Sequence, residues 1–318
     1  MDMPLFDETR AIFFDEPYPN PFEITEMKTL AEVADDLEPS MNLVVAQIGE
    51  KTFAMPTLAM VYHKVAQGTL DETPFMMTFC VLCNHGGVFE TRVEDDIAHF
   101  GCYGFHQGMA VLSDVETQSR WNHITGHCVY GEKKGYKLER IGDIRHTTVG
   151  ELINTDPDTL ISFPVFNTEE TETANRWNNN YRSQHPAWSD GLLGTFAVRD
   201  ERLPRFDMGV GVWTGNTARY YRVLTLNAQN NAIVDTIDGR NVVVYYDEET
   251  GFPSAFYTDA TAAEWVPGIG MRLNNGTTYK NGVIRSGAQK ITPERPRFQN
   301  IRWYGFSYLF PDCEIYGE

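Results

Sequence analysis

The chain has 318 residues, 42% of them hydrophobic, so it is long enough to bury a large core in one domain or two. Its 44 acidic and 26 basic residues give a formal net charge of −18, which argues against nucleic acid or an anionic membrane as a partner. No apolar run reaches the roughly 18 residues of a membrane span. Five cysteines, an odd number, do not favour a disulfide framework. The oligomeric state is left open.

Residues 1–39 are predicted to form an N-terminal extension. The opening MDMPLFDETRAIFFDEPYP is acidic, is interrupted by proline and lacks the charged and apolar regions of a signal peptide. We therefore expect a cytoplasmic protein, unless a leader has been removed. Apolar residues at helical spacing predict a short helix over residues 24–35; they are Ile24, Met27, Leu30 and Val33.

Most of the remaining chain alternates between short β-type runs and turns. The runs are rich in β-branched and aromatic residues, which suit pleated sheets. Examples are residues 41–47, 75–79, 242–246 and 301–306, while residues 149–154 are predicted to form a short helix before Pro157. The predicted fold class is therefore mainly β, with a minor α+β character.

A weak internal repeat is found when the chain is aligned with itself. TLDETPFMMTFC at residues 69–80 aligns without a gap with TIDGRNVVVYYD at residues 236–247, an offset of 167. IGEKTFAMPTLAM pairs with WTGNTARYYRVLT, and LINTDPDTLIS with YLFPDCEIYG, in the same order. We predict two related β-rich repeats packed together, residues 40–167 and 208–318, joined by a connecting segment at 168–207. At this offset the second repeat has Asn230, Asp247 and Thr250 where the first repeat has His63, Cys80 and Cys83, the candidate metal ligands described next. The second repeat is therefore expected to bind no metal.

The first repeat concentrates the residues that bind metals. Six of the eight histidines and four of the five cysteines lie between His63 and Cys128, and Cys80 and Cys83 form a CxxC in MTFCVLCNHGG. Thiolate and imidazole bind soft and borderline transition metals. Glycines follow the CxxC, which favours a metal-binding turn over the helix start of a thioredoxin-like dithiol. No phosphate-binding or dinucleotide-binding glycine motif is present, so no organic cofactor is predicted.

The strings TPFMMTFCVLCNHGGVFE and HFGCYGFHQGMAVLSDVETQSRWNHITGHCVYG resemble the domain of unknown function 3179 family, and the resemblance runs from about residue 40 to the end. The family's aromatic-histidine pair is matched by Tyr62 and His63, which adds His63 to the two cysteines. That family has no assigned activity, so the resemblance implies no reaction. Several residues depart from the family pattern, and most introduce a thiol or an imidazole: His85, Cys102, His106, His123, His127 and Cys128.

We predict a metal site formed by His63, Cys80 and Cys83. His106 is the preferred further ligand, followed by His85 and then His123. Copper is the favoured metal and zinc the alternative. The leading hypothesis is a copper-dependent oxidoreductase that acts on a small molecule, with its catalytic residues unassigned. The alternatives are a non-catalytic metal-binding or structural-zinc protein and a CxxC dithiol redox protein.

Overall fold

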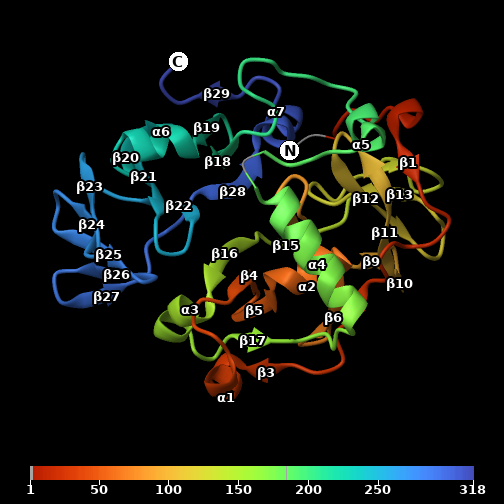
Figure 1. Ribbon diagram of the computed structural model, residues 1–318, viewed down its shortest axis with the longest axis horizontal. Coiled ribbons are helices and arrows are strands. Elements are labelled where there is room, and N and C mark those ends of the chain that lie inside the picture. The colour runs from red at the N-terminus through yellow and green to blue at the C-terminus, as the bar shows by residue number, and fades with distance from the viewer. Residues whose placement is uncertain (1–2, 184) are drawn as a thin grey trace.

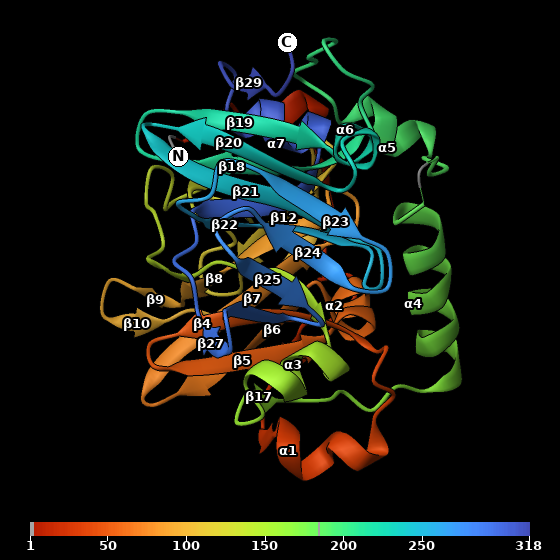
Figure 2. The same cartoon turned by 90° about the vertical axis from the view of Figure 1, so that its left-hand side faces the viewer.

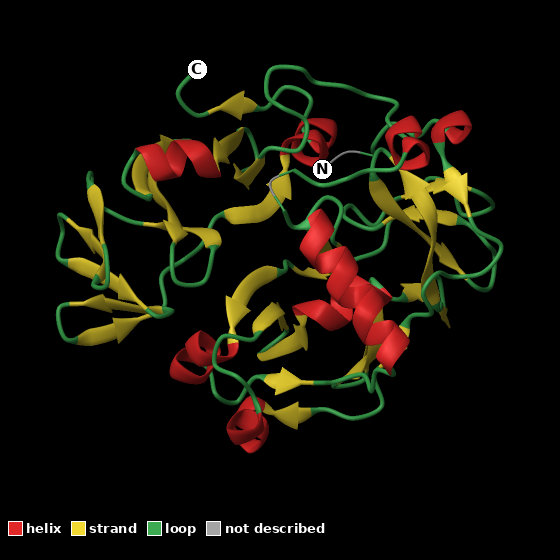
Figure 3. Ribbon diagram, in the orientation of Figure 1, coloured by secondary structure: helices red, strands yellow, loops and turns green. Residues whose placement is uncertain are grey.

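The structure, a computed structural model, describes residues 3–183 and 185–318. The first two residues of the predicted extension and Gln184 of the connecting segment lie outside these ranges. Strands make up 42% of the structure and helices 18%, which confirms the mainly β class (Figure 3). Within the described ranges, no helix combines the length and apolar character needed to cross a membrane.

The N-terminal half forms three five-stranded sheets and a two-stranded hairpin (Figure 1). The first sheet has the order β16-β4-β5-β17-β3, with bounds β3 Lys28–Thr29, β4 Asn42–Ile48, β5 Lys51–Pro56, β16 Arg145–Thr148 and β17 Leu160–Ile161. The second has the order β15-β8-β7-β6-β2, with bounds β2 Phe22–Glu23, β6 Val65–Leu70, β7 Thr73–Cys80, β8 His85–Glu90 and β15 Arg140–Gly142. The third has the order β1-β11-β12-β13-β14, with bounds β1 Ile12–Phe13, β11 Phe100–His106, β12 Met109–Asp114, β13 Arg120–Asn122 and β14 Cys128–Tyr130. The hairpin pairs β9 Arg92–Val93 with β10 Asp96–Ile97.

The helices of this half are short, except for one in the connecting segment. That helix, α4 Thr168–Tyr181, begins with a capping box formed by Asn167 and Glu170, and it packs on α2 along one side of the molecule (Figure 2). The other helices are η1 Glu8–Arg10, α1 Leu30–Val33, η2 Ala34–Asp36, α2 Thr57–His63, α3 Val149–Thr155 and α5 Asp190–Gly194.

The C-terminal half contains three sheets. The first has the order β28-β18-β19-β29, with bounds β18 Met208–Trp213, β19 Ala218–Arg222, β28 Arg297–Arg302 and β29 Glu314–Ile315. The second joins β20 Ala232–Ile237, β21 Arg240–Asp247 and β22 Phe252–Tyr257. The third is a meander of β23 Ala263–Val266, β24 Gly270–Leu273, β25 Thr277–Lys280, β26 Val283–Ser286 and β27 Gln289–Ile291. Its helices are α6 Val223–Ala228 and α7 Trp303–Leu309.

The two halves share one order of elements and one pattern of pairing. The first half contains elements in the order β4-β5-α2-β6-β7-β8, and the second half repeats this order of strands and helix as β18-β19-α6-β20-β21-β22. Val65 pairs with Thr78 in the first half and Ala232 with Tyr245 in the second, so both numbers differ by 167. Residues with a positive backbone φ recur at the same offset of 167. The pairs are Lys64 and Asn231, Asp71 and Asp238, and Asn84 and Gly251. The common origin of the halves and the domain boundaries stay predictions.

Two of the predicted elements differ from the structure in their extent or type. Over residues 24–35 the chain forms β3, the four-residue α1 and η2, because the segment pairs with β17 and Thr29 starts the helix with a capping box. Residues 303–306 belong to α7 rather than to a strand. Arg302 pairs with Met208, the first residue of β18, so the ladder has no further partner beyond it. The predictions at residues 41–47, 75–79, 149–154 and 242–246 are confirmed by β4, β7, α3 and β21.

A buried polar network joins the two halves beside the position equivalent to the CxxC. The Tyr279 hydroxyl lies 2.6 Å from Glu151 Oε1 and 2.6 Å from Asp247 Oδ2. A phenol carries one proton, so it can donate to only one of the two carboxyl groups, and the other contact is a hydrogen bond only if that carboxyl is protonated. Burial raises the pKa of Glu151, which favours the neutral form of this carboxyl group.

Glu151→Gln is therefore expected to stabilise the fold at neutral pH. The pKa of the Glu151 carboxyl group is higher in the folded state than its ordinary value of 4.5. Its contribution to stability is therefore complete at pH values below 4.5 and is lost as the pH rises through the folded-state pKa. Glutamine keeps a neutral donor without titrating. Urea unfolding should give a higher midpoint for the variant at pH 7.5 and no gain at pH 4. Asp158→Asn, at an exposed position on the same connection, should show no such difference; a gain that is equal at both pH values would contradict the assignment.

Candidate metal centre

Two turns bring the candidate ligands together. Cys80 ends β7, Cys83 lies in the turn that follows, and left-handed Asn84 lets the chain reverse into β8. His123 lies in the turn after β13, where Asn122 Oδ1 accepts hydrogen bonds from the backbone N–H groups of Ile124 and Thr125. The Thr78 hydroxyl donates to the His123 carbonyl at 2.8 Å, which fixes the second turn against β7.

The Cys80 and Cys83 sulfurs and a ring nitrogen of His123 all lie within 4.8 Å of one another. Cys83 Sγ and His123 Nε2 lie 3.5 Å apart, within hydrogen-bonding distance. All three side chains are buried, with exposed fractions of 1% or less. In the described part of the chain, no other three residues with thiol, imidazole or carboxylate groups come together in this way.

His123 is held in the tautomer that a metal ligand needs. Its Nδ1 lies 2.8 Å from the Ala110 carbonyl oxygen, so Nδ1 carries the proton and donates it. The lone pair of Nε2 is then directed toward the Cys83 sulfur. Burial lowers the pKa of His123 to about 4, which keeps the ring neutral at physiological pH. A hydrogen bond from the distal nitrogen to a carbonyl is the arrangement that orients histidine ligands in metal sites.

The two thiols give up their protons unequally. Burial acts to raise the pKa of Cys80, but hydrogen bonds from the Cys83 side chain and from nearby backbone N–H groups lower it below its ordinary value of 9. The pKa of Cys83 is raised well above that value, by burial and then by its hydrogen bond with Cys80. One proton therefore leaves the pair readily, whereas removal of the second needs a compensating positive charge.

Lys64 is a buried lysine that interacts electrostatically with Cys80. It follows α2 in a left-handed conformation with φ of 63°. Its ammonium donates to the Tyr62 carbonyl at 3.2 Å and lies 4.3 Å from the centre of the Trp177 ring. Among the described residues it forms no salt bridge with a carboxylate. Burial lowers the pKa of Lys64, and its electrostatic interactions with Cys102 and Cys80 oppose that effect.

Gly86 allows the CxxC turn to pack closely. It lies in β8 opposite Phe79, and a Cβ at this position would come within 1.9 Å of the Thr78 carbonyl oxygen. Gly86→Ala should therefore lower the free energy of unfolding by about 3 kcal/mol or more, because a backbone atom cannot move aside as a flexible side chain does. Urea unfolding measures the loss. Gly215→Ala, where the added Cβ meets nothing within 4 Å, should change stability little; equal effects would contradict the packing argument.

The structure places the other predicted ligands away from this group. His63 ends α2, its Nδ1 lies 2.8 Å from the Asn20 carbonyl oxygen, and its ring packs on Phe22 and Phe166. His106 ends β11 and its Nε2 accepts from the Asp7 backbone N–H at 3.2 Å.

His85 lies closer to the group but is not part of it. It pairs with Cys80 in the β7-β8 ladder, and it is buried. Its Nε2 has no hydrogen-bond partner among the described residues. Burial lowers its pKa well below the ordinary value, and the nearby positive charge of Arg140 adds to this effect.

In the sequence-based prediction His123 is the third choice for a further ligand, and Lys64 has no role. The sequence feature that could have favoured His123 is the turn predicted by Asn122 and Gly126, because a tight turn fixes the position of the histidine within it. Lys64 had no such signal, because a lysine next to a histidine is ordinary on a helix surface.

The fold and the site define a mainly β protein with a buried thiol pair beside a neutral imidazole. The family described as protein of unknown function (DUF3179) matches residues 23–312, and the chain belongs to this family. The resemblance noted from the sequence is thereby confirmed. Comparisons with curated proteins and with solved structures give no match.

Proposed function

We propose that Cys80, Cys83 and His123 bind one copper ion and that the protein is a copper-dependent oxidoreductase acting on a small molecule. The observation that carries this proposal is the convergence of two sulfurs and one imidazole nitrogen within 4.8 Å, with the imidazole already in the ligating tautomer. Bound copper would supply a one-electron Cu(I)/Cu(II) couple. The protein's own residues would hold the ion, exclude water and set its local charge.

The number of ligands supports copper over structural zinc. Structural zinc sites almost always have four protein ligands, whereas this group offers three. Cu(I) prefers soft thiolates and is satisfied by three ligands in a dry site. Met109, a soft thioether, belongs to the same core cluster as both cysteines.

The local charge supports the same choice. A buried group of charges is most stable when it is close to neutral. Two thiolates with one Cu(I) ion carry a net charge of −1, which the guanidinium of Arg302, a buried residue whose charge acts on Cys83, can offset. Two thiolates with Zn²⁺ are already neutral and leave that positive charge uncompensated. His123 is neutral and adds nothing to this count.

Burial argues against the dithiol alternative. Exchange with another disulfide requires an attacking thiolate that the partner can reach. Cys80 and Cys83 are both 0% exposed, and they lie at a strand end and in a turn rather than at a helix start. A partner could reach them only after the core had opened.

Metal analysis of protein purified without a metal-affinity tag tests the proposal. We expect one copper per chain after anaerobic loading with Cu(I), retention against a moderate chelator, and a Cu(II) electron paramagnetic resonance signal after oxidation. Tightly held zinc that Cu(I) does not displace would instead support a structural-zinc protein.

A further inference from the structure

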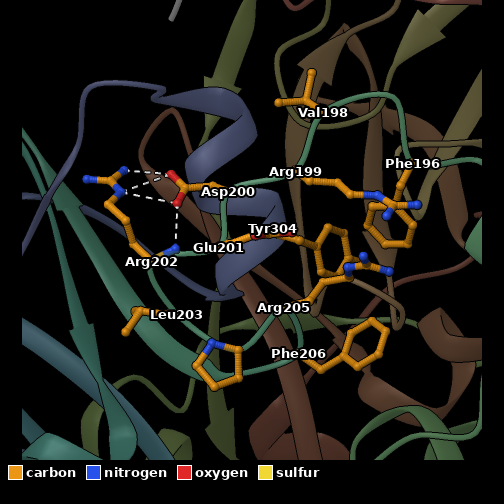
Figure 4. A pocket seen from close by; sticks show the side chains of 11 residues that line it. Phe196, Val198, Arg199, Asp200, Glu201, Arg202, Leu203, Arg205, Phe206 and Tyr304 are labelled. Carbon is orange, nitrogen blue, oxygen red and sulfur yellow. Dashed lines mark hydrogen bonds and ion pairs between the residues drawn. The ribbon is translucent and has the colours of Figure 1, made fainter.

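A pocket of about 470 Å³ shares one of its lining residues, Tyr304, with the core cluster that contains Cys80 and Cys83. It is lined by the segment from Phe196 to Phe206, which precedes β18, and by Tyr304 of α7 (Figure 4). Its volume is in the range that holds a small organic molecule. The pocket combines aromatic rings with three arginines, in a chain whose net charge is −18.

Two of the three arginines form no salt bridge among the described residues, although the carboxylate of Glu201, which also lines the pocket, acts on the charge of Arg205. Arg202 forms a salt bridge with Asp200 at 2.7 Å, whereas Arg199 and Arg205 form none with any described residue. Figure 4 shows the side chains of Arg199 and Arg205 extending toward the Phe196 ring, while Arg202 turns to Asp200. The Arg205 guanidinium lies 4.4 Å from the centre of that ring. Two neighbouring guanidinium groups repel each other, and an anion bound between them would remove the repulsion.

Tyr304 connects this pocket with the core that holds the thiols. Its hydroxyl donates to the Gly108 carbonyl at 2.7 Å, and its ring packs on Phe196 and belongs to the core cluster that contains Cys80 and Cys83. The next residue, Gly305, lies against Cys83, since a Cβ on Gly305 would be 3.5 Å from the Cys83 Cβ. A molecule in the pocket would therefore contact Tyr304, which belongs to the same packed core as the candidate metal centre.

We propose that this pocket binds a small carboxylate with an apolar body, and that this carboxylate is the substrate class of the centre; the second half of this inference rests on the proposed function. Arg199 and Arg205 bind the carboxylate, since planar guanidinium groups match its two oxygens. Phe196 and Phe206 contact the apolar body.

The carboxylate site is tested on metal-free protein with benzoate as the probe and benzamide as its neutral counterpart. Titration calorimetry should show saturable binding of benzoate and much weaker binding of benzamide. Arg199→Gln and Arg205→Gln should each weaken benzoate binding about tenfold or more, as expected for loss of a charged hydrogen-bond partner. Arg272→Gln, at an exposed position in β24, should leave the affinity unchanged.

Several results would overturn the carboxylate site. They are no saturable benzoate binding, equal binding of benzamide, tighter binding of inorganic phosphate, or an unchanged affinity in Arg199→Gln. Arg199 is exposed, so its variant is expected to fold as the parent does; circular dichroism checks this.

The link to the centre is tested separately. In Cu(II)-loaded protein the proton resonances of exchanging benzoate should broaden, and in Zn(II)-loaded protein they should not. Benzoate binding without copper-dependent broadening would refute the link alone. Benzoate binding by a protein that binds no copper would refute the proposed function and leave the carboxylate site intact.

Discussion

Cys80→Ser and Cys83→Ser are each expected to abolish stoichiometric copper binding. A hydroxyl is a hard and weakly acidic donor, so it does not replace a thiolate at Cu(I). The loss should be nearly complete for either variant, because the group contains only three donors and a two-donor remnant does not hold the ion against a chelator. Copper content after chelator competition measures the effect, and thermal unfolding shows that the variants remain folded.

Cys102→Ser provides the matched control. Cys102 is also 0% exposed and belongs to the same core cluster, but it does not belong to the three-residue group. The same chemical change there should cost a comparable amount of stability and leave copper binding intact. Retention of one copper per chain by Cys80→Ser or Cys83→Ser would refute the centre.

His123→Ala is expected to weaken copper binding by about 100-fold or more, and His63→Ala to leave it nearly unchanged. Removal of residues that only support a ligand typically costs 10- to 100-fold, so removal of a ligand should reach at least the upper end of that range. His63 is retained as a comparison because the sequence and the family resemblance favoured it, whereas the structure turns its Nδ1 to the Asn20 carbonyl. Competition titrations with a Cu(I) chelator give both affinities.

X-ray absorption adds a second readout for His123. The parent protein should show imidazole scattering together with sulfur scattering, and His123→Ala should show sulfur alone. If His63→Ala weakens binding as strongly as His123→Ala, the group in the structure is not the copper site. His106→Ala, at the end of β11, should behave as the parent does.

The sequence identified the cysteines because their geometry is local. Two thiols three positions apart across one turn meet whatever the rest of the chain does, so the CxxC needs no tertiary information. His123 is different, since it follows Cys83 by 40 positions and reaches the site only because β7, β12 and the turn after β13 pack together. No spacing rule connects residues that are joined by sheet packing.

The neighbouring pair His63 and Lys64 shows a second limit. His63 is the last residue of α2 and Lys64 is its C-cap, where a left-handed φ of 63° changes the direction of the chain. A non-glycine residue adopts this conformation at an energetic cost that the surrounding structure must offset. The lysine at this position is buried, and the histidine before it lies against Asn20 and Phe22.

The sequence by itself determined the mainly β class, the family and the CxxC. It also determined the offset of 167, at which the pairing register of β6 with β7 recurs in β20 with β21. These follow from short-range alternation, turn residues and spacing along the chain. Only the tertiary structure decided that residues 303–306 are helical, that His123 joins the thiols, and that Arg199 and Arg205 face a pocket beside Tyr304. Each of these depends on which segments pack together, and packing between distant segments is set by the burial of the whole chain rather than by any local run of residues.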